Sequence, residues 1–221
     1  MKIINKKSEK SLIDQFIRDF KKDYLRRKKQ NKRLSFVLTG GKSPIKLYRK
    51  LAQINIDWNI VDFFWGDERY VSNQSKNSNF KLAYNEFIRK IKIDKKNVFP
   101  IKTNKSISKC SADYSKEIKK YFKYKKINFD YCLLGMGKDG HVASIFPNSE
   151  NLYDRFITKP VIRGDFKRIT LSLNVINNSK KILLWLNNKS KSEIYFKIKK
   201  EGIKIPVNNL NKKKTIIYKI H

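Results

Sequence analysis

The chain has 221 residues, 40% of them hydrophobic, which is enough to bury the core of one moderately large domain. Its 52 lysine and arginine residues and 19 aspartate and glutamate residues give a formal net charge of +33. No run approaches the roughly 18 apolar residues of a membrane span, and the two cysteines lack the CxxC spacing of a zinc site.

The positive charge has two explanations. A charge of this size is typical of proteins that bind nucleic acid. The basic residues are spread over the whole chain, however, and Lys, Asn and Ile are abundant together, as an AT-rich coding sequence would impose on any tolerant surface. We favour solvated, compositionally biased faces and do not expect specific nucleic-acid binding. The opening MKIINKKSEK is charged and has no apolar signal segment, so a cytoplasmic protein is expected.

The first predicted elements are a helix, a strand and a second helix. Apolar residues at helical spacing predict a helix over residues 9–29. LSFVL (34–38) predicts a buried strand, and TGGKSP follows it at once. Ser43 as a capping residue and Pro44 as the first helical residue predict a helix over 44–53.

The rest of the chain continues this alternation. Strands are predicted at 60–71, 98–101, 129–135, 169–173, 182–186 and 215–220, and helices near 79–91, over 111–122 and near 189–200. Apolar strands alternating with helices are typical of an α/β fold with a largely parallel sheet. No internal repeat and no linker rich in Pro, Gly or Ser interrupts the pattern, so residues 1–221 are expected to form a single domain.

Three polar loops each follow a predicted buried strand: TGGKSP (39–44), GDERYV (66–71) and GMGKDGH (135–141). In open parallel sheets, ligands bind beyond the carboxyl ends of the strands, where such loops converge. We therefore expect the three loops to line one site.

The TGGKSP loop has the features of an anion site. Gly40 and Gly41 allow backbone amides to approach a ligand closely, and the helix after them would present its N-terminal dipole to a phosphate. A tight strand-to-helix turn is the structural alternative, and this loop alone does not separate the two. The pattern GxxxxGK[ST] of nucleotide P-loops is absent.

The GDERYV loop places three ionisable side chains at a strand end. Asp67 and Arg69 lie two residues apart and project to the same side of an extended chain, whereas Glu68 points away. Taken alone, this cluster is best explained as a structural ion pair. Trp65, beside it, is expected in the core.

The GMGKDGH loop fits the dinucleotide pattern GxGxxG, but the later acidic residue that such a site needs does not end a predicted strand. No cofactor is therefore expected. His141 is the only histidine apart from the terminal His221. A lone histidine is usually structural, but imidazole is the side chain best suited to accept a proton at neutral pH, which makes His141 a candidate general base.

Longer segments resemble a known family. They are LTGGKSPIKLYRKLA (38–52), DFFWGDERYV (62–71), SNFKLA (78–83), FDYCLLGMGKDGHVASIFPN (129–148) and RITLSLNVINNSKKILLWL (168–186). In this order they are similar to the motifs of the glucosamine-6-phosphate isomerase/6-phosphogluconolactonase superfamily, in particular its lactonase branch, from about Ser35 to Lys191. The resemblance implies a modified Rossmann-like α/β fold, with a mostly parallel sheet flanked by helices. It also implies hydrolysis of 6-phospho-D-glucono-1,5-lactone in the oxidative pentose phosphate pathway, without a metal or cofactor.

The resemblance also implies roles for individual residues. It makes His141 the general base and places Arg69 near the lactone, with Asp67 either binding hydroxyls or orienting Arg69. The implied substrate- and phosphate-binding residues are Gly40, Gly41, Lys42, Ser43, Gly137, Asp139, Gly140, Arg168 and Lys191, with Lys189 as the alternative to Lys191.

The chain departs from the family pattern at several positions. Lys42 stands where the family usually has Ser or another small residue, so it either adds a phosphate donor or crowds the loop. Asn187-Asn188 replaces a Thr-Gly-like pair. The isomerase branch resembles a pattern with a glutamate in an FNEP-like string; Phe146, in SIFP, stands there instead, which favours the lactonase over the isomerase. The oligomeric state is not predicted.

Overall fold

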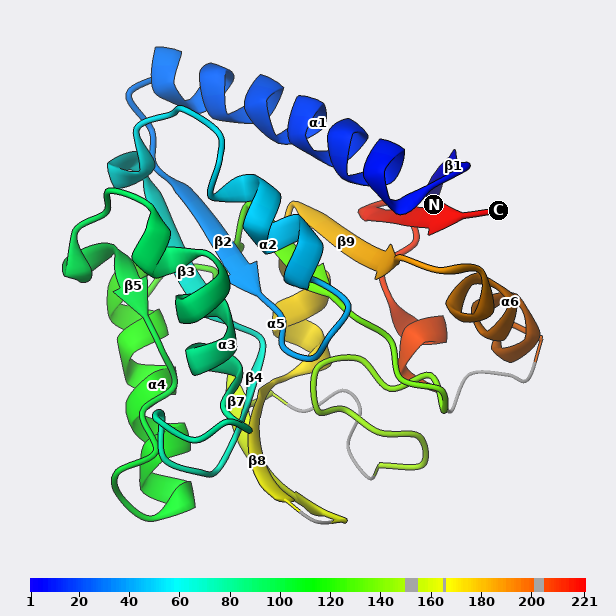
Figure 1. The fold of residues 1–221 in the computed structure, drawn as a ribbon. Coiled ribbons are helices and arrows are strands. Elements are labelled where there is room, and N and C mark those ends of the chain that lie inside the picture. The colour runs from blue at the N-terminus through cyan, green and yellow to red at the C-terminus, as the bar shows by residue number, and fades with distance from the viewer. Residues whose placement is uncertain (150–154, 165, 201–204) are drawn as a thin grey trace.

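The computed structural model describes residues 1–149, 155–164, 166–200 and 205–221 (Figure 1). A seven-stranded sheet runs through it in the order β1-β10-β9-β6-β2-β3-β5, and all neighbouring strands are parallel. The strands are β1 (Lys2–Lys6), β2 (Leu34–Leu38), β3 (Val61–Trp65), β5 (Val98–Phe99), β6 (Tyr131–Leu134), β9 (Lys181–Leu186) and β10 (Thr215–Ile220). The predicted parallel α/β architecture is confirmed.

Six α-helices accompany the sheets within the described ranges. They are α1 (Glu9–Lys29), α2 (Ile45–Leu51), α3 (Asn79–Glu86), α4 (Ile107–Tyr121), α5 (Leu173–Asn178) and α6 (Lys189–Ile198), with short 3₁₀ turns at Trp58–Ile60, Ile88–Lys90, Lys95–Asn97 and Pro206–Asn209. Helix α1 has the bounds that the sequence predicts. None of the described helices is long and apolar enough to cross a membrane.

Helices cover both faces of the large sheet. Phe63 and Phe64 are consecutive in β3 and therefore point to opposite faces. The ring of Phe63 contacts that of Phe36, which in turn contacts Phe16 of α1. The ring of Phe64 contacts Tyr121 of α4, with centroids 4.9 Å apart. The core is thus two aromatic layers with the sheet between them, and Trp65 is fully buried as expected.

A second, antiparallel sheet has the order β4-β8-β7, with β4 (Asp67–Arg69), β7 (Thr158–Arg163) and β8 (Phe166–Leu171). The prediction of one strand over 60–71 is wrong, because the chain changes sheets at Gly66. The Gly66 amide donates to the Leu38 carbonyl (2.9 Å), and the Gly66 carbonyl accepts from the Leu171 amide (2.8 Å). Gly66 therefore joins the two sheets.

The helix start after TGGK also differs from the prediction. Pro44 is the N-cap of α2 and makes no side-chain capping bond. The Ser43 hydroxyl, predicted to cap the helix, accepts a hydrogen bond from the ammonium of Lys191 instead. At the predicted strand 169–173, β8 ends at Leu171, and Ser172 caps α5 by accepting from the Val175 amide.

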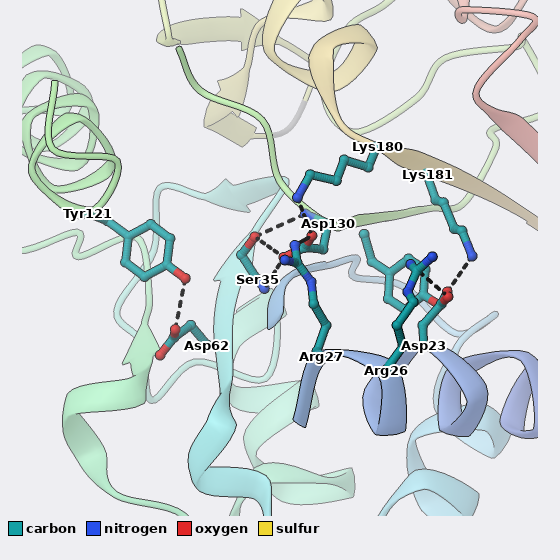
Figure 2. Close-up of polar contacts among 10 residues, drawn as sticks. Asp23, Arg26, Arg27, Ser35, Asp62, Tyr121, Asp130, Lys180 and Lys181 are labelled. Carbon is teal, nitrogen blue, oxygen red and sulfur yellow. Dashed lines mark hydrogen bonds and ion pairs between the residues drawn. The ribbon is translucent and has the colours of Figure 1, made fainter. Parts of the chain in front are cut away.

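Carboxylates and cations are paired at the amino ends of the strands (Figure 2). Asp130 accepts hydrogen bonds from the Ser35 amide (3.0 Å) and the Lys180 ammonium (2.8 Å) and pairs with Arg27. On α1, Asp23 pairs with Lys181 and Arg26, and in β3 Asp62 accepts from Tyr121, as Figure 2 shows. Each of these carboxylates has at least two donors, so the cations at this edge of the sheet face anionic partners.

Candidate active site

A cavity of about 500 Å³ lies at the opposite edge, beyond the carboxyl ends of β2, β3, β6 and β9. After β2 the chain crosses to β3, and after β6 it crosses to β9 in the other direction, so the cavity lies where the strand order reverses. Residues of the TGGKSP, GDERYV and GMGKDGH loops all line it. The prediction that these loops share one cavity is confirmed.

All predicted site residues except Asp139 and Gly140 line this cavity, and Lys191 lines it whereas Lys189 does not. The lining also contains Thr39, Asn79, Gly135, Met136, Ala143, Ser144, Phe146, Asn187 and Asn188. Ser144 and Phe146 belong to the histidine motif and could have been chosen from it. Asn79 belongs to the family-like segment SNFKLA (78–83), but nothing in its type or spacing marked it as a site residue, because it reaches the cavity from the start of a helix.

His141 is held by a folded loop and by a carboxylate. The Gly137 amide donates to the His141 carbonyl (3.0 Å), which folds the loop back on itself. The Oδ1 atom of Asp139 lies 2.6 Å from Nδ1 of the imidazole and also accepts from the His141 amide at 3.2 Å. Asp139, predicted to bind ligand, is therefore a neighbour of the histidine outside the cavity lining.

The ionised carboxylate of Asp139 determines which ring nitrogen of His141 carries the proton. Burial alone would raise the pKa of Asp139, but the charge of His141 and the hydrogen bonds from it outweigh burial and lower that pKa. An ionised carboxylate can only accept a hydrogen bond, so Nδ1 of the imidazole carries the proton. In the neutral form of the ring, Nε2 is then the nitrogen with a free lone pair.

Gly137 makes room for the imidazole. A Cβ atom at this position would lie 2.1 Å from Cε1 of His141, closer than any real contact. The second glycine of the pattern that resembles a dinucleotide loop is thus explained by the close approach of the histidine ring.

Asp67 connects three elements. It is 8% exposed. Its Oδ2 accepts from the Ser144 hydroxyl (2.6 Å), and its Oδ1 accepts from the side-chain amide of Asn79 (3.2 Å). No ion pair joins Asp67 to Arg69, both of which lie in the described part of the chain; an Nη1–H of Arg69 donates instead to the Asn77 carbonyl (2.9 Å). The structural ion pair that the sequence suggests is therefore not formed.

Glu68 points away from the cavity, as predicted. Its carboxylate is fully buried and accepts four hydrogen bonds, from the amides of Arg69 (2.8 Å), Asn79 (2.7 Å) and Phe80 (2.8 Å) and from the Ser78 hydroxyl (2.9 Å). Burial raises the pKa of Glu68 to about 7 although these hydrogen bonds oppose the shift. Glu68 thus anchors the start of α3, from which Asn79 reaches Asp67.

The cavity is strongly cationic. The positively charged residues in its lining are Lys42, Arg69, Arg168 and Lys191, and the negatively charged residue is Asp67. Arg69 and Arg168 are directly opposite each other in the β4-β8 ladder, where like charges are destabilising. Burial lowers the pKa of Lys191, because a buried ammonium is poorly solvated. An anionic ligand would stabilise this arrangement.

An aromatic ring stands beside the histidine. The Phe146 ring lies 4.7 Å from the His141 ring, with an interplanar angle of 47°. The guanidinium carbons of Arg163 and Arg168 lie 4.6 Å and 5.5 Å from the centroid of the same ring. Phe146 therefore contacts the histidine and two cations, at the position where the isomerase pattern would have a glutamate.

Metal ligands are not clustered in this structure. No three His, Cys, Asp or Glu side chains among residues 1–149, 155–164, 166–200 and 205–221 come together as they would around a metal ion. What the arrangement offers is a proton acceptor, a carboxylate and four cations around one cavity.

Fold and cavity together define an α/β protein with a cationic small-molecule site at the carboxyl edge of a parallel sheet. The family profile described as glucosamine-6-phosphate isomerases/6-phosphogluconolactonase matches residues 7–218. The 6-phosphogluconolactonase of Thermotoga maritima is 38% identical over 157 residues, 70% of each chain. That of Synechocystis is 33% identical over 163 residues, 71% of this chain and 68% of that protein.

Solved structures agree with the sequence comparison. The crystal structure of 6-phosphogluconolactonase from Thermotoga maritima has a TM-score of 0.88 to this chain at 28% identity, and the match covers 99% of this chain and 98% of that one. The chain belongs to the glucosamine-6-phosphate isomerase/6-phosphogluconolactonase family. The Rossmann-like α/β fold that the resemblance implied is confirmed.

Proposed function

We propose that this chain hydrolyses 6-phospho-D-glucono-1,5-lactone to 6-phosphogluconate, a step of the NADPH-generating oxidative pentose phosphate pathway. The observation that carries the proposal is the pairing of His141 with Asp139, at 2.6 Å, beside a cavity that gathers four cations. Family membership and the names of the similar proteins support it. The reaction needs neither metal nor cofactor, because the carbonyl of a strained lactone is already electrophilic.

His141 is the proposed general base. Nε2 of the neutral imidazole takes a proton from water, and the water oxygen attacks the lactone carbonyl. Arg69 or loop amides stabilise the oxyanion that forms. The bond from the carbonyl carbon to the ring oxygen then breaks, and the charged His141 returns the proton to the leaving alkoxide. The new carboxylic acid loses its remaining proton to solvent and becomes the carboxylate of the product. Asp139 accepts the Nδ1 hydrogen bond throughout, which makes it a positioning residue in this proposal.

The cationic lining is the proposed phosphate and sugar site. Lys191, Arg168 and Lys42 supply positive charge, and the loop of Gly40, Gly41 and Ser43 supplies backbone and hydroxyl donors. Gly137 borders this space, and Gly140 packs against the Ile205 side chain behind it. Asp67 is proposed to bind sugar hydroxyls, because its hydrogen-bond partners are Ser144 and Asn79 and not Arg69.

Phe146 supports hydrolysis over isomerisation. An aldose-ketose isomerase needs a second acid or base beside the histidine to move a proton between neighbouring carbons. The ring of Phe146 occupies that place, and Asp67 is the only carboxylate among the described residues of the lining.

The direct test is hydrolysis of freshly generated lactone, measured against spontaneous opening, for the wild type and His141→Ala. Loss of positioned proton transfer should lower the rate by about 10²- to 10⁴-fold. A circular dichroism spectrum shows whether the variant is folded. Equal rates for the two proteins would show that His141 is not the base.

The remaining expectations concern the whole chain. We propose that residues 1–221 act as one domain in the cytoplasm and that the positive charge serves no specific nucleic-acid partner. Binding to duplex DNA should then be weak and should collapse near about 150 mM salt. Saturable, sequence-dependent binding at that salt, together with no lactonase activity, would favour a nucleic-acid-binding function instead.

A further inference from the structure

Hydrolysis changes the charge of the ligand in this cavity. The lactone carries only its phosphate charge, whereas the product carries the phosphate and a carboxylate, which is one more negative charge. We propose that the positive charge of the cavity suits the more negative product. The cavity therefore retains the sugar acid, and the sugar acid inhibits the enzyme. This inference rests on the proposed function and adds a regulatory property to the same site.

The cations at the two edges of the sheet have different partners. At the amino edge, Lys180 and Arg27 face the carboxylate of Asp130 (Figure 2). At the cavity, the Lys191 ammonium donates to the neutral hydroxyl of Ser43, and the Lys42 ammonium forms no hydrogen bond or ion pair with any residue that the structure describes. Neither ammonium has a carboxylate partner among the described residues, which suits both lysines to an anionic ligand.

The fold places two further cations of the cavity on neighbouring strands. Arg69 and Arg168 are directly opposed in the β4-β8 register, and the same ladder pairs Asp67 with Thr170. Asp67, the one carboxylate that the described part of the chain contributes to the lining, already accepts hydrogen bonds from Ser144 and Asn79. Its charge offsets the cations only in part, so the positive potential of the cavity persists in the absence of ligand.

The transition state and the product carry the same charge. When water attacks the carbonyl, an oxyanion develops. The ligand then carries the phosphate charge and one further negative charge. A cavity whose potential stabilises this oxyanion also stabilises the carboxylate that replaces it. Product retention is thus a consequence of the way in which the cavity promotes the reaction, and we expect product release to limit turnover.

Lys42 is the residue with which to test this. It lines the cavity on the loop after β2, it is exposed, and the proposed chemistry at His141 does not involve it. Lys42→Met removes the charge and keeps most of the chain length. Lys50→Met is a matched control, because Lys50 is also an exposed lysine, lies on α2 a few residues away, and does not line the cavity.

The experiment measures inhibition by 6-phosphogluconate while proton release reports lactone hydrolysis. Glucitol 6-phosphate, which has the phosphate and the open chain but no carboxylate, serves as the comparison ligand. In the wild type, 6-phosphogluconate should inhibit about 10-fold more strongly than glucitol 6-phosphate, and its inhibition constant should lie below KM. Rising salt should weaken this preference, because it screens the charges.

The variants then locate the effect. Lys42→Met should raise the inhibition constant of 6-phosphogluconate by about 5-fold, with a smaller rise in KM, and Lys50→Met should change neither. Equal inhibition of the wild type by the two ligands, or equal shifts in the two variants, would overturn the inference while lactone hydrolysis stands. Calorimetric titration of the free protein with both ligands measures binding without turnover, so it tests product retention separately from lactone hydrolysis. A wild type that does not hydrolyse the lactone would refute the proposed function itself.

Discussion

Phe146 is one of the residues through which the histidine loop contacts the second sheet. Its ring contacts His141 on its own loop and the guanidinium groups of Arg163 and Arg168, which belong to β7 and β8. Cation–π contacts of this kind fix the direction of a guanidinium without neutralising it. Phe146 therefore packs against Arg168 at the cavity, where the Arg168 guanidinium also donates to the carbonyls of Arg163 and Phe166.

Replacing Phe146 by Leu keeps an apolar side chain but removes the ring. We expect KM for the lactone to rise about 5-fold, because a partly buried cation–π contact contributes about 1 kcal/mol. Steady-state kinetics of lactone hydrolysis measures the change. Phe156→Leu is the control, since Phe156 is 66% exposed and does not line the cavity. A similar rise in both variants would mean that the ring of Phe146 has no such role.

Glu68 predicts a pH dependence of stability. Burial raises its pKa to about 7 in the folded chain from an ordinary value of 4.5, so the folded state binds a proton more tightly than the unfolded state. The stabilisation is complete below pH 4.5 and is lost as the pH rises to about 7. The free energy of unfolding of the wild type should therefore fall over this range relative to that of Glu68→Gln.

Urea unfolding at several pH values tests this, with Glu193→Gln, at an exposed position, as the control. If the difference in the free energy of unfolding between wild type and Glu68→Gln is the same at every pH, the four donors around Glu68 keep it ionised over the whole pH range. Glu68→Gln should also be less stable at every pH by about 1–3 kcal/mol, because its amide N–H groups would face those donors.

Among the elements, the loop after β6 determines the position of the catalytic candidate. Gly137 does not have a positive φ, so its backbone would accept alanine, but the added Cβ would lie 2.1 Å from the imidazole of His141. The glycine is therefore required by the position of a side chain four residues later.

Gly137→Ala should lower kcat by about 100-fold, because a displacement of about 1 Å is enough to misalign a proton acceptor. Thermal unfolding should change far less than kcat. Gly135→Ala tests the same loop at a site where an added Cβ meets Thr39 only at 3.9 Å, and it should lower kcat much less. Equal losses in the two variants would indicate general damage to the loop.

The elements that the sequence predicts are those whose signals are local. Helix α1, strands β2, β6, β9 and β10 and the carboxyl-edge cavity follow from apolar periodicity and from the polar loops after strands. Strand β1 was not predicted, because its sequence KIINK is charged and its structure depends on pairing with β10. The second sheet is not predicted for the same reason. In the sequence β4 looks like a continuation of β3, and only its pairing with β8 makes it a separate strand.

The candidate site follows the same division. His141, Asp67 and Arg69 could be selected from their types and spacing, and the family pattern added Arg168 and Lys191. The contact of Asp139 with the imidazole depends on how a loop folds back, and the approach of Asn79 to Asp67 depends on the packing of α3. Neither is encoded in a spacing, so only the structure reveals them.

At the scale of the whole molecule, the charge of +33 acts on stability as well as on binding. Like charges repel each other more in the compact state than in the extended chain, and salt screens this repulsion. The free energy of unfolding in urea should therefore rise between about 0.01 M and about 1 M NaCl. A fall would show that the ion pairs at the amino edge, such as Asp130 with Lys180, outweigh the repulsion.

The pairing of Arg69 with Arg168 has a consequence for biosynthesis. These residues are far apart in the sequence and become neighbours only when β8 docks beside β4. A chain emerging from the ribosome acquires His141 and the TGGKSP loop well before it acquires Arg168 and Lys191. The active cavity is therefore completed only after Lys191 has been synthesised, and enzymatic activity reports the folding of the chain from the TGGKSP loop to α6.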